Sequence, residues 1–170
     1  GIIIDAADFS EDPPRGFKRL VLGGDGCLGH SYVIRCDEVV KNATGEIVEL
    51  RCSADLNTLG KNPEGRKVKG VIQWVSASKG VTAEVRLYDR LFTLPNPESS
   101  DNLLDSLNPD AFKIVQAWVE PSLADVQPED RFQFEREGYF VADLKDCVAG
   151  KLVFNKTVSL RDSWGVKAGE

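Results

Sequence analysis

Arg66-Lys67-Val68-Lys69-Gly70-Val71-Ile72-Gln73-Trp74-Val75-Ser76 is followed, after a short link, by Ala83-Glu84-Val85-Arg86-Leu87-Tyr88-Asp89-Arg90. Both runs are rich in residues that favour strands, and a Gly-containing loop joins them, which predicts that they pair. Alternation in the second run places Val85 and Leu87 on one face of its strand, and Arg86 and Tyr88 on the other. The outer face is therefore cationic and aromatic. Single-stranded RNA binders have such faces, but so do ordinary β-barrels, so this pattern alone leaves both interpretations open.

Length and composition indicate a globular protein. The chain has 170 residues, 42% of them hydrophobic, which is enough for one large or two small domains with cores. No apolar run is long enough to span a membrane, and the N-terminus lacks the features of a signal peptide, so we expect a cytoplasmic protein. Four cysteines lack the CxxC spacing of a zinc site, and we expect free thiols at Cys27, Cys36, Cys52 and Cys147.

The net charge of −6 is unevenly distributed along the chain. Residues 1–14 contain four acids and no Lys or Arg, residues 15–90 contain 13 basic and 9 acidic residues, and residues 91–170 contain 8 basic and 14 acidic residues. Salt screens charges more than about 8 Å apart under physiological conditions, so a positive block can hold phosphates within an acidic chain. The charge pattern therefore permits RNA binding by the middle of the chain.

Short strands separated by Gly and Pro turns are predicted along most of the chain. A hairpin is expected over residues 37–48 with its turn at 42–45, which makes Cys36 and Cys52 candidate cross-strand neighbours. A second hairpin is expected around Arg136-Glu137-Gly138, and a short helix from Ser99 or Ser100 to Leu107. Other strands are predicted at residues 17–22, 32–36, 112–119 and 152–161. The pattern predicts an all-β fold of two small antiparallel β-barrels with one or two short helices.

No motif for catalysis or cofactor binding stands out. Gly24, Gly26 and Gly29 form a GxGxxG pattern, but a β-rich run follows it where a dinucleotide site needs a helix. The single histidine, His30, is not accompanied by a nucleophile pattern. Two facing carboxylates of a glycosidase barrel are possible in principle, but nothing singles out a pair among the 27 acids. We therefore expect no catalytic, cofactor or metal site in this chain.

Several runs together are more specific than generic β-structure. They closely resemble, in the same order, the C-terminal anticodon-binding region of bacterial glutaminyl-tRNA synthetase, a class I enzyme. The resemblance extends from about Ile2 to Trp164. The runs that carry it are Phe17 to Leu20, Arg66 to Ser76, Val85 to Phe92, Phe132 to Phe140 and Val153 to Trp164.

This resemblance implies two β-barrels, of a fold related to the L25 type of ribosomal protein, appended to a catalytic domain that is absent from this chain. We expect residues 16–79 to form the first, inserted barrel, and residues 1–15 plus 80–170 to form the second. The whole enzyme would join glutamine to its tRNA with ATP and Mg²⁺, but HIGH-like and KMSKS-like signatures do not occur here. The expected partners are the anticodon stem-loop of tRNA(Gln) and the N-terminal catalytic domain, in a monomer that does not contact a membrane.

The resemblance also implies which residues contact the anticodon. Lys18 and Arg19 match a pair that contacts its third base in particular. Gln133 and Arg136 match residues that help to form the pocket for the central uracil, whose edge needs both a donor and an acceptor, as an amide has. Ser163 matches a position near the anticodon that is usually Thr.

Strand alternation agrees with the role of the central-uracil residues. Phe132 and Phe134 are expected to face the core, which would leave Gln133 on the outer face of the strand and Arg136 at the hairpin turn.

One departure from the family concerns the first anticodon base. Cys27 and Gly29 stand where the family often has two arginines, and neither can supply charge-assisted hydrogen bonds. Either Arg35 or His30 substitutes for them, or the first base is read loosely. The alternative function is that of a non-enzymatic ribosomal RNA-binding barrel. The runs Phe132 to Phe140 and Val153 to Trp164 favour the synthetase over this alternative.

Overall fold

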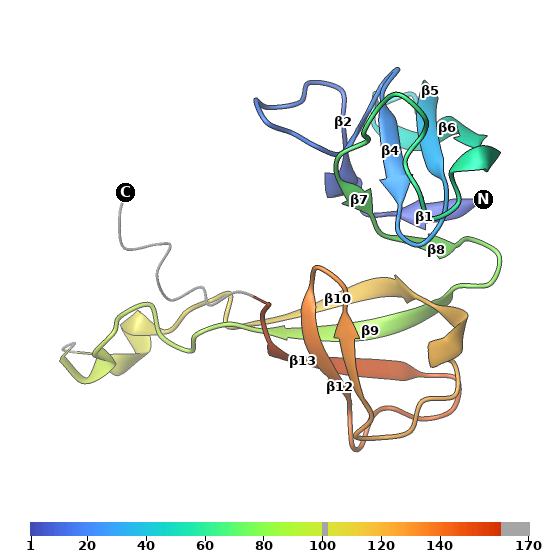
Figure 1. Ribbon diagram of the computed structural model, residues 1–170. Helices are drawn as coiled ribbons and strands as arrows, with labels where there is room; N and C mark the ends of the chain where they lie inside the picture. Colours follow the sequence, from blue (N-terminus) through green and yellow to red (C-terminus); the bar gives the residue numbers. More distant parts are fainter. Residues whose placement is uncertain (100–101, 161–170) are drawn as a thin grey trace. The chain divides into compact units, whose positions relative to one another are not determined.

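The computed structural model describes residues 1–99 and 102–160, which fold mostly as β-strands (Figure 1). Within these ranges the helical segments are short 3₁₀ turns, and no α-helix is present. None of these segments has the length and apolar character that crossing a membrane as a helix requires. The chain divides into two compact units, Gly1–Ser78 and Lys79–Glu170, which we describe separately.

Unit 1 is built around a four-stranded sheet in the order β6-β5-β4-β7 and two small two-stranded sheets, β1-β8 and β2-β3. The β4–β7 and β2–β3 pairs are parallel, and the other pairs are antiparallel. The elements are β1 (Ile2–Ile4), η1 (Ala6–Asp8), β2 (Phe9–Ser10), β3 (Leu20–Val21), β4 (Asp25–Leu28), β5 (Val33–Lys41), β6 (Ile47–Asp55), η2 (Leu56–Thr58), β7 (Val71–Ile72) and β8 (Trp74–Ser76).

The β5–β6 hairpin confirms the predicted turn. Asn42 organises this turn, because its side-chain oxygen accepts hydrogen bonds from the backbone N–H groups of Thr44 and Glu46, at 3.0 and 2.9 Å. Such Asx turns are a common reason for Asn in loops. The core of the unit consists of Leu20, Leu28, Ile34, Cys36 and Ile72.

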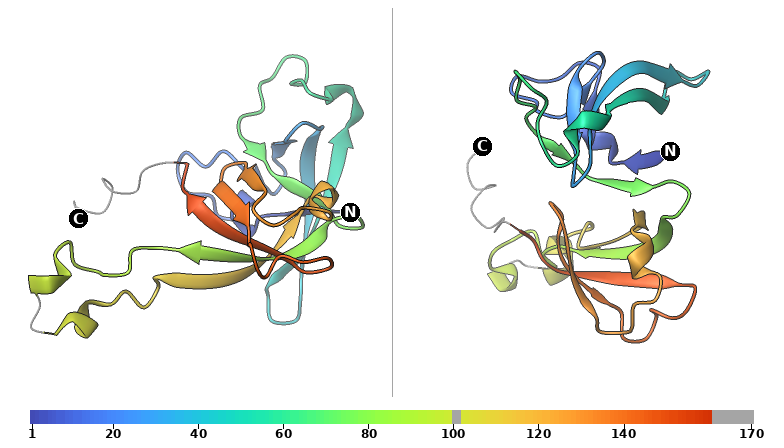
Figure 2. Two further views of the ribbon diagram at one scale, coloured as in Figure 1. Left: turned by 90° about the horizontal axis from the view of Figure 1, so that it is seen from below. Right: turned by 45° about the vertical axis from the view of Figure 1, so that its right-hand side comes forward.

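Unit 2 is a five-stranded sheet in the order β10-β9-β13-β12-β11, in which the last strand of the described residues lies between β9 and β12 (Figure 2). β13 runs parallel to β9, and the other pairs are antiparallel. The elements are β9 (Val81–Tyr88), η3 (Pro97–Ser99), η4 (Leu103–Ser106), β10 (Phe112–Val119), η5 (Pro121–Leu123), β11 (Arg131–Phe134), β12 (Gly138–Ala142) and β13 (Leu152–Val158).

Alternation along the strands determines which face of this sheet is buried. On β9, Ala83 and Val85 are buried and Leu87 packs against the same core, as the sequence predicted for Val85 and Leu87. Phe140 and Phe154 come from β12 and β13 to the same cluster. Residues at the intervening positions form the outer face of the sheet.

Three sequence predictions differ from the structure. The run at residues 66–76 does not pair with the run at 83–90: it provides β7 and β8, which pair with β4 and β1, and the boundary between the units separates it from β9. The sheets are mixed and not purely antiparallel. The expected helix ending near residue 107 is represented by the two 3₁₀ turns η3 and η4.

The structure also groups residues 1–15 differently from the expected division. β1 pairs with β8 and β2 pairs with β3, so this segment lies with unit 1 and not with residues 80–170. Pairing of the chain's first strand with a strand 70 residues later has no local sequence signal. The boundary itself, between residues 78 and 79, lies next to the expected one.

Candidate nucleic-acid interface

Lys18 and Arg19 lie together immediately before β3, but their side chains have different surroundings. Lys18 is exposed, whereas Arg19 is half-buried and donates from Nε to Oδ1 of Asp8 at 2.9 Å. The Asp8 side chain is fully buried, at the end of η1. The parallel pairing of Phe9 with Leu20 brings these segments side by side. Arg19 is therefore held in place by a buried carboxylate, and Lys18 is the more available cation.

A basic loop lies against this pair of residues. Gly70 has a φ of +89°, and a Cβ there would overlap the carbonyl oxygen of Lys18. The glycine is required because the two backbones approach so closely. Lys67 and Lys69, on the same loop, are exposed. The resemblance did not single them out, but they belong to the basic stretch that begins at Arg66 and extend the positive surface next to Lys18.

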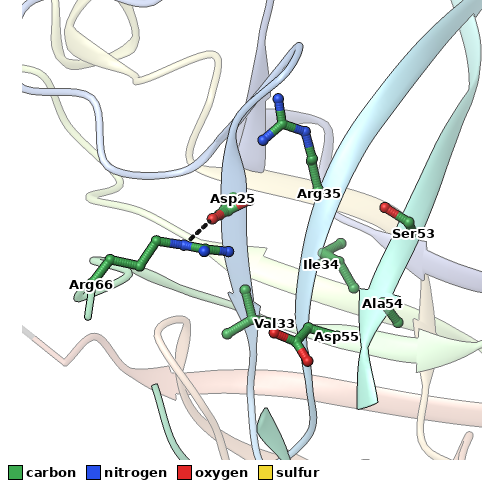
Figure 3. A pocket seen from close by; sticks show the side chains of 8 residues that line it. All are labelled: Asp25, Val33, Ile34, Arg35, Ser53, Ala54, Asp55 and Arg66. Carbon is green, nitrogen blue, oxygen red and sulfur yellow. Dashed lines mark hydrogen bonds and ion pairs between the residues drawn. The ribbon is translucent and has the colours of Figure 1, made fainter. Parts of the chain in front are cut away.

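A shallow depression of about 180 Å³ lies between Arg66 of the same loop and strands β4, β5 and β6 (Figure 3). Arg66 donates from Nε to Oδ2 of Asp25 at 2.9 Å, while its own side chain stays 57% exposed. Both charge signs line the depression, which therefore favours polar ligands over apolar ones. Its lining residues are Asp25, Val33, Ile34, Arg35, Ser53, Ala54, Asp55 and Arg66.

The two positions where the family often has arginines lie in β4, at Cys27, and just after it, at Gly29. Cys27 is half-buried opposite Val33, and Gly29 is buried with its carbonyl accepting a 2.9 Å hydrogen bond from Nε1 of Trp74. Arg35 on β5 lies directly opposite Asp25 on β4 in the strand register, and its side chain is 57% exposed. Because β4 is a strand and not the start of a helix, the GxGxxG pattern is not a dinucleotide site.

Gln133 occupies the position that alternation predicts. It is exposed on β11, while Phe132 and Phe134 on either side of it pack against the core of unit 2. Its direct cross-strand neighbour is Tyr139 on β12, which is 45% exposed. An amide beside an exposed aromatic ring offers both edge recognition and stacking to an unstacked base.

Arg136 lies at the tip of the same hairpin. Its φ of +70° is uncommon for a residue with a side chain, and the N–H of Glu137 closes the turn by donating to the carbonyl of Phe134 at 3.0 Å. Phe134 stacks on Phe140 with ring centroids 4.4 Å apart, and its edge meets Phe154 at 5.4 Å. This aromatic cluster anchors the hairpin to the core of unit 2 and so determines where Gln133 and Arg136 lie.

A polar network links β9 to β13 and to the loop after β12. Arg86 donates to Glu84, Asp143 and Asp146 at 2.8, 3.2 and 2.6 Å. Asn155 donates to Asp143 at 2.7 Å and accepts from the hydroxyl of Tyr88 at 2.8 Å. The hydrogen bond from Asn155, with those from two backbone N–H groups and the nearby guanidinium, lowers the pKa of Asp143 to about 2. The network ties the central strand of the sheet to β9.

The structure thus brings the predicted residues together in two places. Lys18 and Arg19 share one segment of unit 1, and Gln133 and Arg136 share one hairpin of unit 2. Ser163 lies outside the described residues. Sequence reasoning missed Asp8, whose only signal was an acid within an apolar run at the start of the chain.

Comparisons with known proteins agree with the resemblance. Residues 71–143 match a family described as "tRNA synthetases class I (E and Q), anti-codon binding domain", a range that contains Gln133 and Arg136.

In alignments of 168 positions that cover 96% of the chain, it is 65% identical to a glutamine–tRNA ligase of Ectopseudomonas mendocina, 62% to one of Pseudomonas aeruginosa and 60% to one of Azotobacter vinelandii. It spans about 30% of the length of these relatives. Nearly the whole chain is therefore similar to part of these glutamine–tRNA ligases, and its residues 71–143 match the anticodon-binding family of class I synthetases.

Proposed function

We propose that this chain binds the anticodon stem-loop of tRNA(Gln) and serves as the recognition region of a glutamine–tRNA ligase. The catalytic domain, with its ATP and Mg²⁺, would lie outside this chain, and the whole would act as a cytoplasmic monomer. In this proposal Lys18 and Arg19 contact the third anticodon base, and Gln133 and Arg136 the central uracil. Ser163 would lie nearby.

The observation that carries the proposal is the β11–β12 hairpin. Gln133 on β11 and Arg136 at the turn are three residues apart on one hairpin, and Tyr139 lies directly across the strand pair from Gln133. An amide that can donate and accept, a guanidinium and an exposed ring are the groups that a single uracil needs for its edge, phosphate and face. The buried phenylalanines below keep this arrangement in place before RNA arrives.

We also propose that each unit is a small barrel of the anticodon-binding type, with the basic Lys18 segment on the first and the Gln133 hairpin on the second. Support comes from the mostly β composition of both units and from their separate cores. Arg35 is our candidate for contact with the first base, because it is exposed in the depression next to β4.

The decisive experiment compares binding of an anticodon stem-loop of tRNA(Gln) with that of a stem-loop whose central uracil is replaced. We expect the replacement to cost about 1–3 kcal/mol of binding free energy, as a mismatched base does at other specific interfaces. Gln133→Ala should abolish this difference. Gln116→Ala is the matched control, since it removes an exposed glutamine from β10 of the same sheet.

Salt separates base recognition from simple charge attraction. Raising the salt concentration should lower the affinity for both stem-loops, because phosphate contacts release counterions. The difference in binding free energy between the two stem-loops should be preserved. Equal and weak binding of both RNAs, lost at the higher salt, would contradict the proposal for this chain. Loss of discrimination in Gln116→Ala as well would place recognition elsewhere on the sheet.

A further inference from the structure

Two cysteines face each other across the β5–β6 hairpin. Cys36 on β5 is directly opposite Cys52 on β6 in the strand register. Opposed residues of antiparallel strands project from the same face of the sheet, so the two side chains lie next to each other. They are close enough for Cys36 to contribute to the raised pKa of Cys52, while the Cys36 thiol itself donates to the carbonyl of Glu38 at 3.8 Å. The cross-strand placement expected from the sequence is thus confirmed.

The backbone hydrogen bonds of Cys36 show which kind of pair this is. Its N–H donates to the carbonyl of Gly24 at 3.1 Å, and its carbonyl accepts from the N–H of Gly23 at 2.8 Å. Both groups are therefore used on the side of β4 and are directed away from β6. A pair of this non-hydrogen-bonded type has Cα atoms about 4.5 Å apart, which falls within the range of about 4.4–6.8 Å that a disulfide spans.

The two thiols differ in access. Cys36 is fully buried in the core of unit 1, whereas Cys52 is exposed on β6, an edge strand of the sheet. A reagent in solution can therefore reach Cys52 first, and the thiol of Cys36 lies next to it on the neighbouring strand. Neither of the remaining cysteines shares this arrangement: Cys27 is opposite Val33, and Cys147 belongs to the core of unit 2.

We propose that Cys36 and Cys52 form a two-electron redox site, which closes to a cross-strand disulfide on reaction with a low-molecular-weight disulfide such as oxidised glutathione. The Cys52 thiolate first attacks the reagent, forms a mixed disulfide and releases one thiol. The Cys36 sulfur, after losing its proton to water, then attacks the sulfur of Cys52 and releases the second thiol. The protein loses two electrons and two protons, and the reagent is reduced to two thiols.

The chemistry of the reduced pair makes this a slow site. Burial raises the pKa of Cys36, and partial burial together with the neighbouring thiol raises the pKa of Cys52 to about 11. The reactive thiolate is therefore scarce near neutral pH. Closure should follow the sustained ratio of disulfide to thiol around the protein and not a brief exposure to oxidant.

The test is to incubate the chain with oxidised glutathione, alkylate the remaining thiols and map the peptides by mass spectrometry. We expect a peptide in which Cys36 and Cys52 are cross-linked, with Cys27 and Cys147 alkylated in the same sample. Closing this loop should raise the Tm of unit 1 by about 5–10 °C, and dithiothreitol should reverse both changes.

Two variants separate the steps. In Cys36→Ala the exposed Cys52 should accumulate as a mixed disulfide with glutathione, because the second thiol is missing. In Cys52→Ala, Cys36 should resist the reagent because it is buried. If the unaltered chain stops at the mixed disulfide, links Cys52 to a second chain, or keeps both thiols free at equilibrium, the proposal is overturned.

Discussion

Single backbone positions in this chain control where candidate RNA-binding side chains lie. Arg136 adopts a φ of +70°, which costs a residue with a side chain about 1–2 kcal/mol relative to the usual region. A residue kept in such a conformation at a turn is often retained for its side chain. Gly70, with a φ of +89°, is a second backbone position of this kind.

Arg136→Gly should weaken binding of the anticodon stem-loop, because the guanidinium is lost. Glycine adopts this φ without strain, so the backbone of the turn keeps its conformation. The control is Glu129→Gly, since Glu129 has nearly the same φ, +71°, before β11. It should not affect RNA binding. Equal losses of binding in both variants would assign no special role to Arg136.

Gly70→Ala should destabilise unit 1 by more than about 2 kcal/mol, because its Cβ would overlap the carbonyl oxygen of Lys18. Gly45→Ala is a control with almost the same φ, +85°, and open space around the new Cβ. It should cost only about 1 kcal/mol. Chemical denaturation of both variants measures the difference, and similar costs would contradict the close approach of the two segments.

Among the elements, the link between β9 and β13 should depend on pH. The pKa of Asp143 is about 2 in the folded chain and ordinarily 3.8, so its contribution to stability is complete above about pH 4 and is lost as the pH falls towards 2. Its side chain is 16% exposed, and solvent screening reduces the contribution to about 1–2 kcal/mol.

Asp143→Asn should therefore lower the free energy of unfolding at pH 7 and have a much smaller effect near pH 2. Thermal unfolding at several pH values checks this. The control Asp125→Asn removes an exposed acid from the same unit and should show little difference at either pH. A cost for Asp143→Asn that is constant from pH 7 to pH 2 would exclude ionisation as its cause.

The elements that sequence analysis predicted well have local causes. Alternation placed Val85, Leu87 and Gln133 on the correct faces, and turn residues placed both hairpins. Whether residues 66–76 pair within unit 1 or with β9 depends on where the chain returns, which a single sequence does not encode locally. The Asp8–Arg19 ion pair depends on the parallel β2–β3 contact in the same way.

For the whole molecule, two separate cores suggest two separate unfolding events. Calorimetry should resolve two transitions, of which Gly70→Ala lowers one and Asp143→Asn the other. Hydrogen exchange should accelerate in residues 1–78 in the first variant and in residues 79–160 in the second. Transitions that shift together in both variants would instead indicate one cooperative body.

The central position of β13 has a consequence for how the chain forms on the ribosome. All strands of unit 1 have been made by Ser76, whereas the sheet of unit 2 lacks its middle until residues 152–158 emerge. Until then the two hairpins β9–β10 and β11–β12 each have an unpaired edge strand, β9 and β12, with which β13 will later pair. Pairing over long sequence separations is slow, and open strand edges attract other strands. Nascent unit 2 is therefore the stretch where the chain most needs protection from aggregation while it is being synthesised.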